Sequence, residues 1–240
     1  MRLPTGPTKM KSLPQLTEAF QTPRLQYLKP DREDPAFRTF ITQALLDTDI
    51  QGQLGIQQVQ PYTENDVDGF IDKITNSLLG VAICLQPGQE FHDQRPGDAK
   101  VAGEPLTAME GIIGFLYVCV PPADPFGLGI YRNGKITMAL APGYRSDGYG
   151  SEALGWALKW SFDRADLHTL HASIPSYNHT ALRLFHRLGF TVEGWRKQVI
   201  FQDGKFLDIV EYGITVRAWL HDKKRESPRS PINIDRSENN

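Results

Sequence analysis

The chain has 240 residues, of which 40% are hydrophobic and 22% are charged. These proportions are ordinary for a soluble globular protein, and the length suits one domain or at most two. The formal net charge of -2 argues against bulk electrostatic binding to nucleic acid or to an anionic membrane. We therefore expect neither nucleic acid nor membrane as a partner.

Cys84 and Cys119 both lie in apolar runs, so they are expected to be buried, reduced thiols. No hydrophobic stretch reaches the ~18 residues that a membrane-spanning helix needs. The first residues contain no apolar core of a secretory signal, and a cytoplasmic location is the expectation. The six histidines do not form a metal-ligand set, so no metal is expected.

Both ends of the chain lack an apolar period. Residues 1–22 are expected to form a mobile arm, and residues 221–240 a disordered tail. One domain is thus expected over residues 23–220. Within it, residues 87–110 form a long insertion rich in Gly and Pro, which is either disordered or a lid.

The hydrophobic pattern predicts strands and helices in a mixed order, without internal repeats. Strands are predicted at 24–29, 78–85, 111–120, 135–141, 169–174, 190–201 and 206–216. Helices are predicted at 34–46, 63–76, 149–164 and 178–188. Thr63 or Asn65 is the expected N-cap of the second helix, and Asn178 is the expected N-cap of the last.

The most informative stretch is the strand-turn-helix segment ITMALAPGYRSDGYGSEALGWALKW. Arg145, Gly148 and Gly150 form an R-x-x-G-x-G pattern where the helix begins. A helix N-terminus presents unpaired N–H groups and a partial positive charge, so it can cradle diphosphate oxygens. Glycines let the backbone approach a ligand, and Arg145 can add charge near a phosphate. Taken alone, the motif is explained equally well by a turn that simply requires glycines.

Two other phosphate-binding patterns fit this segment poorly. It is not a P-loop, because no Gly-Lys-Ser/Thr follows the glycines. It also lacks a clear place for the acidic residue of a dinucleotide fingerprint.

Further short motifs follow in order along the chain. They are Asn178, then Leu188-Gly189-Phe190, then Glu193-Gly194, and finally Asp208 in GKFLDIVEYGI. Together with the turn at 142–153, these blocks resemble the GNAT superfamily of acetyltransferases. Within that superfamily the pattern is most similar to the ribosomal-protein and small-molecule acetyltransferases. The resemblance covers about 135–216 well, and it covers the first third of the chain only through element order.

The resemblance implies an α/β (α+β) GNAT fold with a central mixed, mostly antiparallel sheet of about six to seven strands. That sheet would be splayed between the fourth and fifth strands and covered by helices on both faces. Acetyl-CoA would be the co-substrate, with no metal, and an acceptor amine would attack the thioester directly. The implied cofactor-binding residues are Met138, Ala139, Leu140, Arg145, Ser146, Asp147, Gly148, Tyr149, Gly150, Ser151, Asn178 and Phe185.

The catalytic acid and base do not carry over from the resemblance. A serine common in the family is Ala181 here, and the tyrosine used to protonate the leaving thiolate is Phe185. The strand at 135–141 also lacks the glutamate that many relatives place there. By position alone, the candidates are Glu193, Ser173, His171 and Tyr177.

Three functions remain open. The first is an N-acetyltransferase, monomeric or homodimeric, that acts on a primary amine of a small molecule or on a protein N-terminus. The second is a non-catalytic CoA-binding or interaction protein that kept the fold. The third is a generic nucleotide-binding domain. The acceptor is not indicated by the sequence.

Overall fold

The structure is a computed structural model that describes residues 18–47, 50–51, 62–87, 111–120, 132–202 and 204–226. Most of both expected tails and nearly all of the insertion expected at 87–110 lie outside these described residues. In the described part, no helix is long and apolar enough to cross a membrane.

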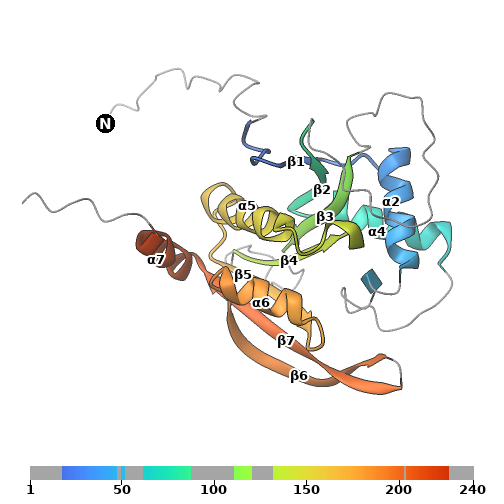
Figure 1. Cartoon of the computed structure of the whole chain (residues 1–240). Helices are drawn as coiled ribbons and strands as arrows, with labels where there is room; N and C mark the ends of the chain where they lie inside the picture. Colours follow the sequence, from blue (N-terminus) through green and yellow to red (C-terminus); the bar gives the residue numbers. More distant parts are fainter. Residues whose placement is uncertain are drawn as a thin grey trace, which may run out of the picture.

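A seven-stranded mixed sheet forms the centre of the molecule (Figure 1), in the order β1-β2-β3-β4-β5-β7-β6. Its strands are β1 (Leu25–Leu28), β2 (Leu79–Leu85), β3 (Ile112–Cys119), β4 (Asn133–Leu140), β5 (Thr169–Pro175), β6 (Thr191–Gln202) and β7 (Lys205–Thr215). All neighbouring strands are antiparallel except β4 and β5, which are parallel. The predicted mixed, mostly antiparallel sheet is therefore confirmed.

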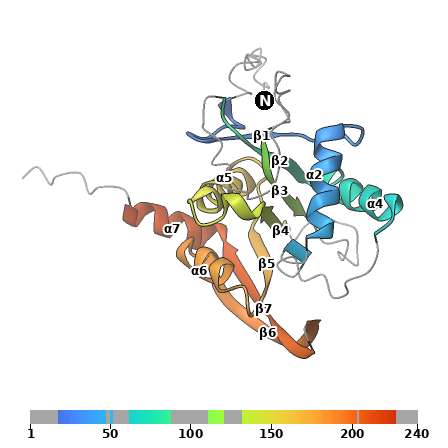
Figure 2. The same cartoon turned by 45° about the vertical axis from the view of Figure 1, so that its right-hand side comes forward.

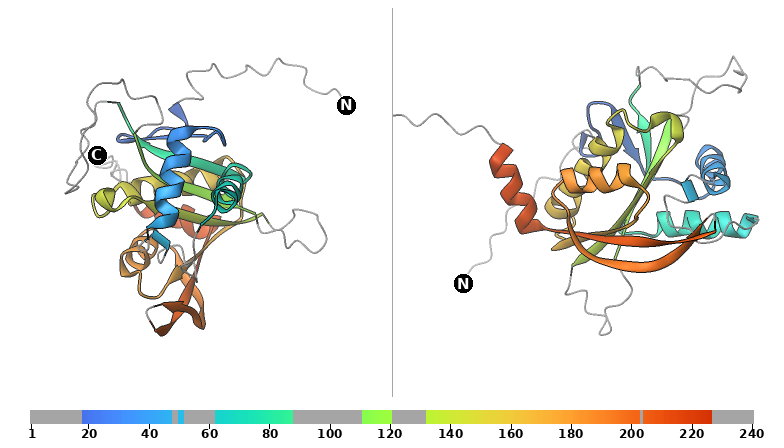
Figure 3. Two further views of the ribbon diagram at one scale, coloured as in Figure 1. Left: turned by 90° about the vertical axis from the view of Figure 1, so that its right-hand side faces the viewer. Right: turned by 60° about the horizontal axis from the view of Figure 1, so that its bottom comes forward.

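Helices cover both faces of the sheet (Figure 3). On one face lie α2 (Pro35–Leu46) and α4 (Glu64–Thr75), and on the other lie α5 (Tyr149–Asp163) and α6 (His179–Arg187). Strand residues alternate between the faces, so each face has its own apolar core. Phe115, Tyr117 and Ala139 belong to the core under α2 and α4, whereas Leu116 and Ile136 belong to the core under α5.

The parallel pair β4 and β5 separates soon after it begins. The two strands pair only at Asn133–Lys135 and Thr169–His171, although β4 continues to Leu140 and β5 to Pro175. Beyond Lys135, the facing edges of β4 and β5 have no strand partner in the described part of the chain. The predicted splay between the fourth and fifth strands is therefore confirmed.

At the end of the sheet, β6 and β7 form a long hairpin that extends away from the body of the molecule (Figure 2). Asp208 on β7 fixes an irregularity in β6, because its carboxylate accepts from Lys197 Nζ at 2.8 Å and from Gln198 N at 2.9 Å. These two hydrogen bonds, that from Lys197 first, hold the pKa of the Asp208 carboxyl below its usual range.

Three expectations need correction. Residues 18–22, expected to belong to a mobile arm, pack on the domain, because Trp156 Nε1 donates to Ala19 O at 3.0 Å and Phe20 contacts the Trp156 ring. Helix α7 (Val216–Glu226) continues past residue 221, where the disordered tail was expected. Trp219 holds this helix, since its ring is buried against Phe162 with ring centroids 5.2 Å apart.

The third correction concerns the cysteines. Cys84 is buried as expected, and desolvation raises the pKa of its thiol to about 12. Cys119 is only half-buried, because it is the last residue of β3 and packs at the margin of the core under α2 and α4.

The docking of residues 18–22 can be tested with one matched pair of substitutions. We predict that Phe20→Ala lowers the free energy of unfolding by about 2 kcal/mol, since it removes a ring packed on Trp156. Phe206→Ala removes a ring that is 63% exposed and should cost less than about 1 kcal/mol. Urea unfolding followed by circular dichroism measures both, and equal costs would contradict the docking.

Candidate functional site

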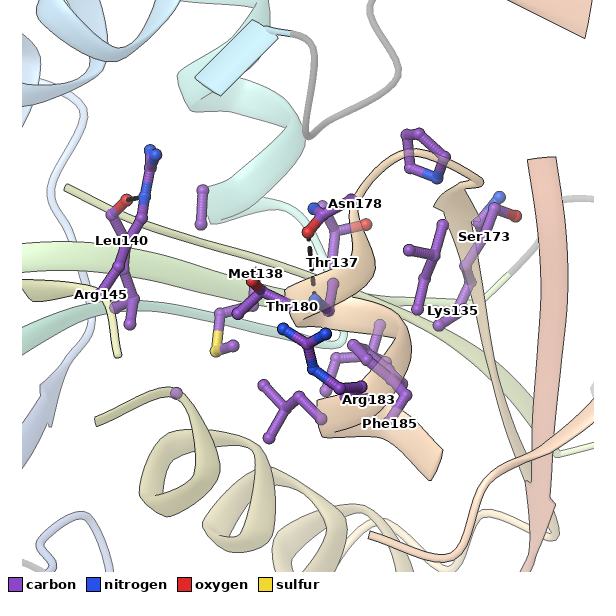
Figure 4. Close-up of a pocket in the computed structure, with 18 of the residues that line it drawn as sticks. Lys135, Thr137, Met138, Leu140, Arg145, Ser173, Asn178, Thr180, Arg183 and Phe185 are labelled. Carbon is purple, nitrogen blue, oxygen red and sulfur yellow. Dashed lines mark hydrogen bonds between the residues drawn. The ribbon is translucent and has the colours of Figure 1, made fainter. Parts of the chain in front are cut away.

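The gap between β4 and β5 opens into a pocket of about 960 Å³, here called the central pocket. Its walls are the free edge of β4, the first turn of α5, the end of β5 and the inner side of α6, with Phe70 and Lys73 of α4 on the far face of the sheet. Figure 4 shows Arg145 and Leu140 at one end, Lys135 and Ser173 at the other, and Met138 between them. Pockets of this size hold ligands as large as a nucleotide cofactor.

The beginning of α5 differs from the beginnings of the other helices around the sheet. Asp34, Thr63 and Asn178 each accept backbone N–H hydrogen bonds and so cap α2, α4 and α6 with a side chain. Gly148 caps α5 in the left-handed conformation, with φ of +84°, and no side chain caps this helix. Its first-turn N–H groups and its positive dipole end therefore remain available to an anion in the central pocket.

Gly150 lets the backbone of α5 come close to both neighbouring elements. A Cβ at this position would lie 3.3 Å from Leu184 Cδ2 of α6 and 3.5 Å from Met138 Cε of β4. A longer side chain would occupy the mouth of the central pocket between these elements. This glycine of the motif therefore serves the close approach of α5 to α6 and β4, and not the turn alone.

Arg24, immediately before β1, ties the turn to the rest of the domain. Its Nη1 donates to Asp147 O at 2.9 Å, its Nε donates to Glu152 at 2.7 Å, and its guanidinium lies 4.4 Å from the ring centroid of Tyr149. Sequence reasoning missed Arg24, because the only signal is a complementary pair of charges 128 residues apart.

The carboxylate of Glu152 is stabilised by this tie. Burial acts to raise its pKa, but hydrogen bonds from Thr22 and from the backbone and side chain of Arg24 hold the pKa below its usual range. A lowered carboxyl pKa stabilises the folded state above the unfolded value of ~4.3, and this stabilisation is lost as the pH falls through the folded value. The position of the turn is therefore secured at neutral pH.

Three arginines line the central pocket near the turn. Arg145 Nε donates to Leu140 O at 2.9 Å, which fixes the end of β4 against the turn. Arg187 of α6 donates to Ser151 Oγ at 2.6 Å, and Arg183 lies one turn earlier on the same helix. These cations add to the dipole of α5, so this end of the pocket suits a ligand with several negative charges.

Asn178 and Phe185 lie on the side of the pocket that α6 forms. Asn178 Oδ1 accepts from Ala181 N at 3.0 Å, so the residue is both a helix cap and part of the pocket wall. The Phe185 ring is 6% exposed and meets Phe190 edge to face at a centroid distance of 4.8 Å. Phe185 thus closes the bottom of the pocket with apolar surface.

The structure brings together nearly all of the residues expected to bind the cofactor. All of them line the central pocket except Asp147 and Tyr149. The carbonyl of Asp147 is engaged by Arg24, and the side chain of Tyr149 is buried beneath the turn.

Of the catalytic candidates, the structure places only some in the central pocket. Ser173 lines the pocket and donates a hydrogen bond to Glu211, which also accepts from Arg196 Nε at 2.7 Å. Glu193 pairs instead with His171 at 3.0 Å and does not line the pocket, nor does Tyr177. Glu211 was missed, although an acid between the buried Val210 and Tyr212 of one strand was a usable signal.

The acetyltransferase (GNAT) family matches residues 69–190. A spermidine N(1)-acetyltransferase of Escherichia coli (strain K12) is 23% identical over 95 residues, which are 40% of this chain and 51% of that protein. The uncharacterized N-acetyltransferase YnaD of Bacillus subtilis (strain 168) is 30% identical over 94 residues, 39% of this chain and 54% of that protein. The chain thus spans about half the length of these curated relatives.

Solved structures share the fold over a longer span. Spermidine N-acetyltransferase from Vibrio cholerae, in complex with CoA and spermine, superposes with a TM-score of 0.60 at 18% identity, over 82% of this chain and 98% of that chain. A GNAT-family acetyltransferase from Bacillus anthracis gives a TM-score of 0.58 at 20% identity, over 82% and 97%. The family match covers about half of the chain and includes the α5 turn and the gap beside β4. The chain therefore belongs to the acetyltransferase (GNAT) family.

Proposed function

We propose that this protein transfers an acetyl group from acetyl-CoA to the nitrogen of a primary amine, on a small molecule or at a protein N-terminus. One observation carries the proposal. The N-terminus of α5, which no side chain caps, and the unpaired edge of β4 open into the same pocket. A site for a diphosphate is thereby joined to a strand edge that can bind an extended amide chain.

The residues of the pocket fit CoA in chemical character. The first turn of α5, with Gly148, Gly150 and Ser151, would hold the diphosphate, and Arg145 would add positive charge. The edge of β4 from Met138 to Leu140 would bind the pantetheine arm as an added strand. When bound, acetyl-CoA supplies an acetyl group activated as a thioester.

The amide side chain of Asn178 faces that edge of β4 from α6. Its Oδ1 is used by the helix cap, so its amide nitrogen would donate to a carbonyl of the pantetheine arm. Asp147 and Tyr149 would contribute their backbone N–H groups only, because the Asp147 carbonyl already accepts from Arg24 and the Tyr149 ring is buried beneath the turn.

Transfer requires a neutral amine and a route for one proton. The amine nitrogen bonds to the carbonyl carbon while the carbon–sulfur bond breaks, and the nitrogen gives up a proton. Ser173 lies in the pocket wall with its hydroxyl bound to Glu211, so this pair offers a relay for the proton. Orientation of the two reactants supplies the rest of the acceleration.

A CoA-binding protein without turnover is the second candidate, and two observations favour it. Phe185 cannot donate a proton to a leaving thiolate, and Glu211 is already engaged by Arg196. Release of free CoA thiol in the presence of amines separates the two functions, because a non-catalytic protein would bind CoA and release none.

The diphosphate site is tested by two glutamate substitutions in one helix. Gly150→Glu places a carboxylate at the mouth of the pocket, and we predict about 100-fold weaker CoA binding, equivalent to about 2.7 kcal/mol. Gly155→Glu is the matched control, because nothing lies within 4 Å of a Cβ there. Isothermal titration with CoA measures both affinities, and similar losses in the two variants would argue against this site.

The relay is tested at Ser173. We predict that Ser173→Ala lowers kcat by at least about tenfold, because the amine proton loses its path to Glu211, while the affinity for CoA stays within about twofold. The fall of kcat at low pH, which reports protonation of the relay, should also disappear in this variant. If kcat and its dependence on pH are both unchanged, Ser173 lines the pocket but takes no part in proton transfer.

Phe185 tests the position of the leaving thiolate. A thiol with a pKa near ~8.5 leaves reasonably well without an acid, so the absence of a phenol here is tolerable. We predict that Phe185→Tyr keeps or raises turnover and adds a basic limb to the rate against pH. If turnover collapses while CoA affinity is intact, Phe185 is a packing residue and the thiolate lies elsewhere.

A further inference from the structure

The central pocket passes through the sheet and has a second end on the face covered by α4. Ala139 packs in the core under α2 and α4, so Thr137 and Lys135, at alternate positions of β4, lie on that face as well. Lys73 of α4 lies above the same region, with Nζ 5.6 Å from the ring centroid of Tyr117. Tyr117 pairs with Thr137 across the β3–β4 ladder.

This end of the pocket is positively charged. Among the described residues that line the central pocket, none is Asp or Glu, and six are Lys or Arg. Neither Lys73 nor Lys135 forms an ion pair in the described part of the chain. The nearby carboxylates on this face are already engaged, Glu193 by His171 and Glu211 by Arg196.

The phosphates of CoA do not account for these two lysines. Leu140, beside the α5 turn, and Lys135 are five residues apart on an extended strand, a separation of about 16 Å. Arg145, Arg183 and Arg187 stand at the phosphate end. Lys73 and Lys135 therefore face whatever enters from the α4 side, where the second reactant would approach the gap.

We propose that the acceptor is a small primary amine that also carries a carboxylate or phosphate group, which Lys73 and Lys135 bind. This proposal rests on the proposed acetyltransferase function and adds the class of acceptor. An anionic group between two ammonium groups would orient the amine toward the gap beside β4. A polyamine, with several positive charges, would be repelled by the same lysines.

The test uses pairs of amines that differ in one charged group. The full-length protein and acetyl-CoA are given 5-aminovalerate, pentylamine, phosphoethanolamine or spermidine, and the release of free CoA thiol is followed. We expect kcat/KM to be at least about tenfold higher for 5-aminovalerate than for pentylamine, because charge-assisted contacts are lost without the carboxylate. Spermidine should be the poorest substrate, and added salt should narrow these differences.

The lysines themselves are tested by Lys73→Met combined with Lys135→Met. The ratio of kcat/KM for 5-aminovalerate to that for pentylamine should fall to about 1 in this variant. Lys159→Met is the matched control, since Lys159 is exposed on α5 and pairs with Asp163 outside the pocket. A parent protein that prefers spermidine or pentylamine would overturn the proposal, as would a double variant that keeps the parent ratio.

A binding measurement shows which proposal has failed, the acetyltransferase activity or the class of acceptor. If no amine releases CoA, 5-aminovalerate and pentylamine are titrated calorimetrically into the protein saturated with CoA. Binding of 5-aminovalerate alone, weakened at least about tenfold in the double lysine variant, would support the acceptor class and reject the turnover. Equal binding of both amines, or binding of neither, would reject the acceptor class.

Discussion

The divergence of β4 from β5 is the constraint on which the rest of the site depends. Parallel strands normally exchange hydrogen bonds along their whole length, but here the ladder ends after Lys135 and His171. The backbone groups of β4 beyond that point must find partners in a ligand or in water. The same gap lets one pocket pass through the sheet, so the two proposed reactants would meet from opposite faces.

The site also depends on a helix N-terminus whose N–H groups are not occupied by a capping side chain. Gly148 ends the turn in a left-handed conformation and brings no side-chain oxygen to α5, whereas the neighbouring helices are capped internally. Arg24, immediately before β1, donates hydrogen bonds to Asp147 O and to the Glu152 carboxylate and so ties this turn to the first strand. The beginning of the domain thus determines where the turn near its middle lies.

Charge in this protein is arranged locally. The formal net charge of -2 indicates no strong preference for ligands of either charge. All charged side chains in the described wall of the central pocket are nevertheless basic. Cations at both ends, separated by the length of β4, suit two negatively charged reactants better than one. The proposed acceptor class follows from this separation. If all the positive charges lay at one end of the pocket, the phosphates of CoA alone would account for them.

The sequence by itself determined the order of the strands and of the four helices that cover the sheet, the helix cap at Asn178, the glycine turn before α5 and the family resemblance. It left Thr63 and Asn65 as alternative caps of α4, and the structure shows Thr63. These features are local, since hydrophobic periods, caps and glycine patterns act over a few residues. Only the tertiary structure decided the roles of Arg24, Glu211 and the lysine pair, because each depends on contacts between segments distant in the chain. Residues 18–22 and helix α7 were misjudged for the same reason: their stability comes from burying Phe20 against Trp156 and Trp219 against Phe162, and no local pattern encodes either contact.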